Sequence, residues 1–142
     1  MNREELKKVL PYREPMLMPD QVEILIPGEK VQGSKKITEN EFWCAGHFPE
    51  NPVFPGVLLI ETMAQTALIL MGSQCDTYTY PVLARVEDMK FLHPCVPGDL
   101  LKIDAVRLSE VCGFWKIRCV AYLDNMAVAK GTITCCMRRQ EK

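Results

Sequence analysis

Two side chains near the middle of the chain have the chemistry of a proton acceptor and a proton donor. His47 lies in a proline-rich loop, and Glu61 lies in the apolar stretch that follows it. An imidazole exchanges its proton near physiological pH, so His47 is a candidate base. Burial disfavours the charged form of a carboxyl group, so a protonated Glu61 is a candidate acid. For each residue alone a structural role is the alternative: a loop histidine without chemistry, and a glutamate that reaches the helix edge or pairs with a lysine.

An apolar helix, predicted over residues 56–72, has to position Glu61. Pro55 and Gly56 mark its start, because proline is tolerated where the first N–H groups have no helical partner. Apolar residues cover nearly every face of the segment, which predicts a buried helix. The segment is too short and too interrupted by polar residues to cross a membrane, so no membrane insertion is expected. Gln65 is expected to hold Glu61 by an i, i+4 contact.

The start of this helix offers a third chemical group. The N–H of Gly56 and its neighbours have no helical partner and carry the positive end of the helix dipole. Such a place suits the oxygen of a polarised carbonyl. A candidate base and a candidate acid therefore flank a rigid loop that ends at an anion-binding amide.

The other elements are predicted from hydrophobic alternation and turn residues. A short helix is expected over residues 2–10, capped by Asn2 and stopped by Pro11, and a capping-box pattern predicts one helical turn at 38–41. Residues 72–80 are expected to form a polar connection. Strands are expected over residues 21–26, 30–37, 81–92, 100–108, 114–123 and 126–137. Antiparallel strands with short connections need a helix on one face, so the predicted fold class is α+β, with a sheet curled round a helix.

The composition is typical of a globular protein. A length of 142 residues, 48% hydrophobic and 25% charged, suits a single domain over residues 1–142. The net charge of −1 gives no basic excess for nucleic-acid binding. Seven cysteines without a C-x-x-C pair, and only two histidines, indicate neither a zinc site nor a disulfide framework. We therefore expect no metal, reduced thiols and a cytoplasmic location, since the N-terminus also lacks the apolar core of a signal peptide.

Residues 46–65 carry a strong family resemblance. Their pattern, Gly-His-Phe-Pro-x-x-Pro-Val-x-Pro-Gly-Val-Leu-x-x-Glu-x-x-Ala-Gln, resembles the signature of the FabZ-type β-hydroxyacyl-(acyl-carrier-protein) dehydratases. Residues 10–15, 90–99 and 114–124 resemble further motifs of that family in the same order, so the likeness covers nearly the whole chain. Glu rather than Asp at position 61 resembles the Z type more than the related dehydratase-isomerase type.

The resemblance implies a hotdog fold, in which a curled antiparallel sheet wraps one long central helix. It implies dehydration of a β-hydroxyacyl thioester on acyl carrier protein to the trans-2-enoyl thioester, in fatty-acid or related acyl-chain biosynthesis. His47 would be the base, Glu61 the acid and the Gly56 N–H the oxyanion donor, with no cofactor beyond the phosphopantetheine arm of the carrier. Members form homodimers in which His47 of one protomer faces Glu61 of the other, often assembled as a hexamer of three dimers. Further residues expected to line the substrate site are Val57, Gln65, Phe48, Phe54, Met89 and Phe91. For all of these except Gln65, a place in the hydrophobic core is an equal alternative.

Some positions depart from the family pattern. Tyr12 stands where a histidine is usual, Leu92 where a basic residue is frequent, and Arg85 where glycine is common. The departures at Tyr12, Glu50, Asn51 and Leu92 keep open a dehydratase of a specialised polyketide or polyene pathway. Those at Leu92 and Arg85 favour a carrier docking different from that of a housekeeping fatty-acid enzyme. A hotdog thioesterase also stays open, although the His–Glu spacing disfavours it. A non-catalytic acyl-binding hotdog subunit is a further alternative, although such a subunit would be expected to lack either His47 or Glu61. His93 is expected to be structural. Candidate residues for docking an acidic carrier are Lys35, Lys36, Arg85, Lys90, Arg138 and Arg139.

Overall fold

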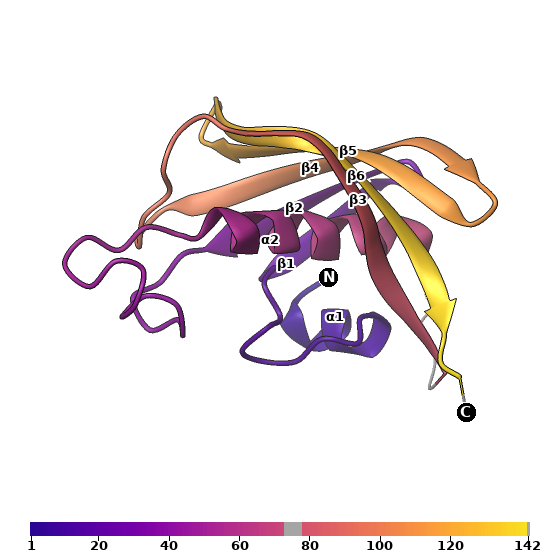
Figure 1. Cartoon of the computed structure of the whole chain (residues 1–142), viewed down its shortest axis with the longest axis horizontal. Coiled ribbons are helices and arrows are strands. Elements are labelled where there is room, and N and C mark those ends of the chain that lie inside the picture. The colour runs from indigo at the N-terminus through magenta and orange to yellow at the C-terminus, as the bar shows by residue number, and fades with distance from the viewer. Residues whose placement is uncertain (73–77, 142) are drawn as a thin grey trace.

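A computed structural model of the protein describes residues 1–72 and 78–141. One antiparallel sheet of six strands curls around a single central helix, α2 (Figure 1). The strand order across the sheet is β1-β2-β4-β5-β6-β3. The helices are α1 (Arg3–Val9) and α2 (Gly56–Leu68), with a 3-10 turn η1 (Ile69–Met71), and the strands are β1 (Gln21–Ile26), β2 (Lys30–Lys36), β3 (Thr79–Phe91), β4 (Leu100–Val111), β5 (Phe114–Leu123) and β6 (Met126–Arg139). The structure thus confirms the predicted α+β class.

The central helix is shorter than predicted. α2 ends at Leu68, and the chain continues as the 3-10 turn η1 to Met71 instead of as α-helix to residue 72. Gly72 then adopts a positive φ of 73°, a conformation that glycine reaches without steric cost. The buried length is nevertheless as expected, because every residue from Thr62 to Met71 is buried.

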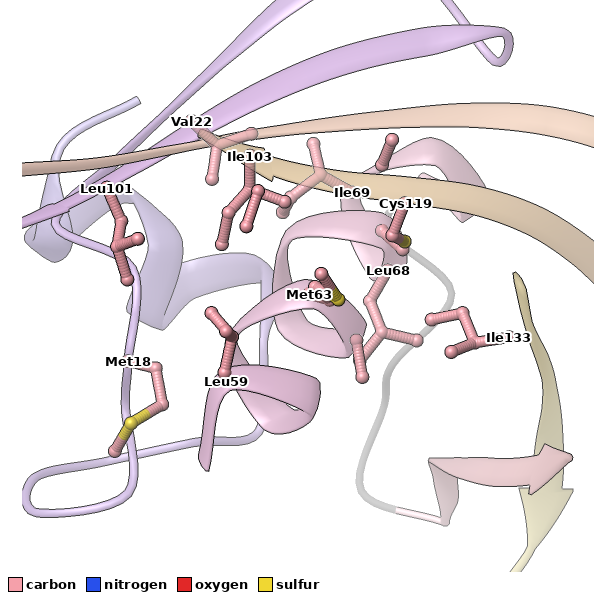
Figure 2. Packing of buried hydrophobic residues seen from close by; sticks show 14 of the residues in the cluster. Met18, Val22, Leu59, Met63, Leu68, Ile69, Leu101, Ile103, Cys119 and Ile133 are labelled. Carbon is pink, nitrogen blue, oxygen red and sulfur yellow. The ribbon is translucent and has the colours of Figure 1, made fainter. Parts of the chain in front are cut away.

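The concave face of the sheet packs directly on α2. Figure 2 shows Met63 and Leu68 of the helix among sheet residues such as Ile103. Gly33 of β2 permits the closest approach, since a Cβ there would lie 2.5 Å from Thr66 Oγ1. The two buried threonines of α2 satisfy their hydroxyls by donating to carbonyls one turn earlier on the helix. The helix and the sheet therefore meet without an unpaired threonine hydroxyl between them.

The two C-terminal hairpins follow the predicted turns, but β4 is longer than predicted. It runs to Val111 because a bulge between Arg107 and Ser109 shifts the alternation without ending the pairing with β5. The turn into β5 has positive φ at both Cys112 (53°) and Gly113 (81°), the geometry that matches the strand twist in a two-residue hairpin. β6 likewise extends to Arg139, beyond the predicted end at residue 137.

Three further sequence predictions need correction. Residues 38–41 form no helical turn: the Thr38 N–H donates to Glu41 Oε2 (2.8 Å), which is half of a capping box, but the chain continues in turns. β3 begins at Thr79, two residues inside the predicted connection 72–80, and the middle of that connection lies outside the described residues. β2 ends at Lys36, one residue earlier than expected. The helix α1 and its Asn2 cap agree with the prediction.

No helix among residues 1–72 and 78–141 combines the length and apolar character needed to cross a bilayer.

The cysteines differ strongly in their surroundings. Cys112 is exposed at the β4–β5 turn, whereas Cys95, Cys119 and Cys135 are buried. Burial raises the pKa of the Cys95 thiol to about 11, with a smaller contribution from Asp99. Burial also raises the pKa of Cys119, and it raises that of Cys135 to about 12, where Cys136 and Glu61 add to the effect.

Alkylation at pH 8 is therefore expected to separate these thiols. The thiolate is the reactive form, and a thiol with a pKa near 11 is ionised to only about one part in a thousand at pH 8. We expect iodoacetamide to label Cys112 in the folded protein and to reach Cys119 and Cys135 only in urea, as read by peptide mass spectrometry. Labelling of Cys135 at the rate of Cys112 in the folded protein would contradict the packing of β6 described above.

Candidate active site

His47 lies in the irregular segment 37–55, which connects β2 to α2 through turns. Its peptide bond to Phe48 is cis. The ring Nδ1 lies 2.8 Å from the Val53 carbonyl oxygen, and the Val53 N–H donates back to the His47 carbonyl oxygen at 2.9 Å. A carbonyl oxygen only accepts, so Nδ1 carries the hydrogen and Nε2 of the neutral ring is left with the lone pair. The loop thereby presents the basic nitrogen of His47.

A cleft of about 330 Å³ lies beside this imidazole. It is bounded by the loop, by the first turn of α2 and by the segment that follows β3. Its lining residues are His47, Val53, Phe54, Gly56, Leu59, Phe91, Leu92, His93, Pro94 and Cys95. The Phe54 N–H donates to the Cys95 carbonyl oxygen (2.8 Å), which ties the loop to the segment after β3.

Gly56 begins α2 at the wall of this cleft. Within the described chain, the N–H groups of Gly56 and Val57 donate to no protein acceptor, whereas those of Leu58 and Leu59 donate to the Pro55 carbonyl oxygen. A Cβ at position 56 would lie 3.1 Å from the ring of Phe91, so a side chain there would press against that ring. Glycine therefore keeps open the space beside two free amides at the positive end of a helix.

Glu61 is held by a buried amide. The Gln65 Nε2 donates to Glu61 Oε1 at 2.8 Å, so the predicted i, i+4 contact is present. The same amide nitrogen donates to the Met16 carbonyl oxygen (2.7 Å), and Gln65 Oε1 accepts from the Met18 N–H (2.8 Å). These bonds use the side chain of Gln65 within the protein. Gln65 thus fixes Glu61 and the loop at 16–18, and its predicted role at the substrate stays a prediction.

The described chain does not bring all predicted site residues together. His47, Phe54, Gly56 and Phe91 line one cleft, but Glu61 is not among the lining residues. Glu61 instead contributes to the raised pKa of Cys135 on β6, which places its carboxyl close to that strand. The two candidate catalytic groups therefore belong to different parts of a single protomer.

The remaining predicted lining residues lie outside this cleft. Val57 is 75% exposed at the start of α2, and Phe48 is 54% exposed. The Phe48 ring stacks on the His47 imidazole, with 4.3 Å between ring centroids. Met89, on β3, is half-buried, and its side chain lies against Gly131 of β6, where the missing Cβ leaves room for it. Phe48 thus supports the imidazole, and Met89 packs against the core.

Sequence reasoning assigned no site role to His93 and treated Lys35 as a surface residue. The exposed His93 lies at the same cleft as His47, with Nδ1 directed at the Pro94 carbonyl oxygen (2.6 Å). No local signal in the sequence indicates this position, because it depends on packing between the segment after β3 and the loop of His47. Lys35, expected on a docking surface, is only 4% exposed and is paired with Glu41.

In the part of the chain that the structure describes, no cluster of three or more His, Cys, Asp or Glu side chains is arranged to hold a metal ion.

The curled sheet around one helix, with an apolar cleft at the helix start, defines a hotdog-fold protein. Solved structures agree: the dehydratase heterocomplex ApeI:P from Xenorhabdus doucetiae is similar with a TM-score of 0.79, covering 94% of this chain and 90% of that one at 16% identity. The fluoroacetyl-CoA thioesterase FlK is similar with a TM-score of 0.66, covering 82% of this chain and 90% of that one at 13% identity. At these identities the likeness concerns the fold.

The chain belongs to the FabA-like domain family, whose model matches residues 10–132. Among its relatives is the 3-hydroxyacyl-(acyl-carrier-protein) dehydratase FabZ of Saccharophagus degradans, 37% identical over 97% of this chain and 98% of the relative. The FabZ of Teredinibacter turnerae is 39% identical over 94% of each chain. That of Granulibacter bethesdensis is 38% identical over 94% of this chain and 81% of the relative.

Proposed function

We propose that the protein is a β-hydroxyacyl-(acyl-carrier-protein) dehydratase, a hydro-lyase of fatty-acid or related acyl-chain biosynthesis. The observation that carries this proposal is a cleft lined both by His47, whose Nε2 keeps its lone pair, and by Gly56, whose N–H donates to no acceptor in the described chain. A base beside an oxyanion donor is what proton removal next to a thioester carbonyl requires. Near full-length likeness to enzymes named for this dehydration supports the proposal.

Each residue has one role in the elimination. His47 Nε2 takes the proton from the α-carbon of the β-hydroxyacyl thioester, while the Gly56 N–H stabilises the charge that develops on the thioester oxygen. The new double bond forms as the bond from the β-carbon to the hydroxyl breaks. Glu61 gives its proton to the departing hydroxyl, which leaves as water. His47 ends protonated and Glu61 ends as a carboxylate, and proton transfer back to Glu61 restores the starting state.

We propose that the acid comes from a second protomer, which is supported by the absence of Glu61 from the residues that line the cleft with His47. We propose that the partner pairs along β3, one of the two edge strands of the sheet (Figure 1). Leu83 and Val86 pair with Cys135 and Ile133, so they face the buried side of the sheet, yet they are 39% and 41% exposed. An edge strand of thirteen residues with apolar side chains left uncovered favours pairing with another strand.

A two-fold axis through β3 would bring the two half-sites together. In such an antiparallel pair, the end of β3 at Phe91 lies beside the opposite end of the partner strand, near Leu83. Phe91 lines the cleft that holds His47. Leu83 pairs with Cys135, and Glu61 contributes to the raised pKa of the Cys135 thiol. His47 of one protomer would then face Glu61 of the other. Three such dimers in a hexamer remain the larger assembly that we expect.

The outer face of the sheet supports an acidic carrier protein as the partner. The strand register places more cations than carboxylates on this face, which points away from α2. The whole chain, by contrast, has a net charge of −1. The cations are Lys30, Lys36, Arg85, Lys90, Lys102, Lys116, Arg118, Lys130 and Arg138, and the carboxylates are Glu23, Glu87 and Asp104. Lys90 directly precedes Phe91, so the basic face reaches the cleft. An acidic carrier docked there could deliver its phosphopantetheine arm to His47.

Removal of either proton-transfer group is expected to abolish most dehydration. We expect Glu61→Gln and His47→Ala each to lower kcat by about 100- to 10,000-fold, the range for one general acid or base. The measurement is ultraviolet absorbance of the conjugated enoyl thioester formed from a β-hydroxyacyl carrier substrate, with folding and dimer formation checked for each variant. Near-normal turnover by a folded Glu61→Gln dimer would remove Glu61 from the mechanism, and release of free thiol by the wild type would favour a thioesterase.

Reversing charge on the outer face is expected to weaken use of the carrier-bound substrate alone. Lys116→Glu combined with Arg118→Glu should raise KM for the carrier-bound substrate roughly tenfold, which corresponds to about 1.4 kcal/mol of docking energy. The same variant should turn over a short pantetheine thioester normally, and added salt should reduce the difference. Lys8→Glu, on the exposed side of α1, is the matched control. An unchanged KM for the carrier-bound substrate would exclude this face as the docking surface.

A further inference from the structure

A lysine is buried beneath the loop that carries His47. Lys35, on β2, is only 4% exposed, and its Nζ lies 2.7 Å from Glu41 Oε1. The same Nζ lies 5.8 Å from the centre of the Phe54 ring, within the range of a cation–π contact. Lysine is rarely buried unless paired, because removing an ammonium from water is costly. This lysine is thus enclosed between a carboxylate and an aromatic ring of the loop.

Glu41 connects Lys35 to the start of the loop. Its second oxygen, Oε2, accepts from the Thr38 N–H at 2.8 Å, so both carboxylate oxygens are used. The neighbouring Ile37 is fixed by its own backbone, which donates to the Asp99 carbonyl oxygen (2.9 Å) and accepts from the Gly98 N–H (2.8 Å). The backbone next to Glu41 is therefore fixed, so that its carboxylate holds the Lys35 ammonium in one place.

Phe54 connects the same ammonium to the end of the loop. Its ring packs edge-on against Trp43, with 5.3 Å between centroids, and its N–H is bonded to the Cys95 carbonyl oxygen. Phe54 follows Val53, whose carbonyl oxygen accepts the hydrogen of His47 Nδ1. A displacement of the Phe54 ring would move this carbonyl and, with it, the plane of the imidazole. Continuous contacts thus run from Lys35 through Phe54 and Val53 to His47.

We propose that Lys35 and Glu41 are positioning residues for His47: their buried ion pair fixes Phe54, and through Phe54 the Val53 carbonyl that orients the imidazole. Neither residue lines the cleft of His47, so the effect passes through the loop. The two residues act as a unit, because loss of one partner leaves an uncompensated buried charge. The kinetic part of this inference rests on the proposed dehydratase function, whereas the orientation of the ring can be measured without it.

The test compares Lys35→Met with Lys8→Met, the same substitution at an exposed lysine on α1. We expect Lys35→Met to lower kcat by roughly 10- to 100-fold with KM for the substrate changed less than about threefold, since a small misplacement of a catalytic group costs rate more than binding. Lys35→Arg should recover most of the rate. In ¹⁵N-histidine NMR spectra, the ring nitrogens of His47 should shift in Lys35→Met and stay unchanged in Lys8→Met.

A second variant covers the case in which Lys35→Met fails to fold. Lys35→Met combined with Glu41→Leu removes both charges together, which folded proteins often tolerate. It should fold and still show the lowered kcat and the shifted His47 resonances. Unchanged His47 resonances in a folded variant would overturn the positioning role, even if activity fell. A wild-type protein without dehydratase activity would instead contradict the proposed function, and the NMR comparison would still decide the role of Lys35.

Discussion

The reciprocal hydrogen bonds between His47 and Val53 determine what the site can do. One bond closes the backbone of the loop, and the other fixes which ring nitrogen carries the hydrogen. Because Nδ1 is bound to a carbonyl, Nε2 is the only basic atom of the neutral ring. The same loop ends at Gly56, whose N–H has no protein acceptor in the described chain. The proposed base and the proposed oxyanion donor thus belong to one short backbone segment.

The proposed acid, Glu61, is positioned by a different part of the fold. Glu61 is attached to the buried α2, and Gln65 couples it to the backbone of the loop at residues 16–18. Its carboxyl is close to Cys135 on β6, next to the edge strand β3. The cleft with His47 lies at the opposite end of that strand. This separation is the reason why we propose that complete sites form only through pairing of two chains at β3.

Local signals in the sequence predict much of this structure. The start of α2, the Glu61–Gln65 contact, the bounds of β1 and β5 and the Asn2 cap depend on residues close together in the chain, where periodicity and capping rules apply. The bulge at Arg107 and the burial of Lys35 depend on strands that meet only in the folded sheet. The place of His93 likewise depends on packing between the segment after β3 and the loop of His47. Sequence reasoning missed these features because no local pattern encodes them.

The central claim is that His47 of one protomer acts with Glu61 of its partner, and mixed dimers test it directly. Protomers carrying His47→Ala are paired with protomers carrying Glu61→Gln through two affinity tags. Each mixed dimer then contains one site with both groups intact and one site with neither, so its dehydration rate should be about half that of the wild-type dimer. A mixed dimer no more active than either parent variant would contradict a site shared between subunits.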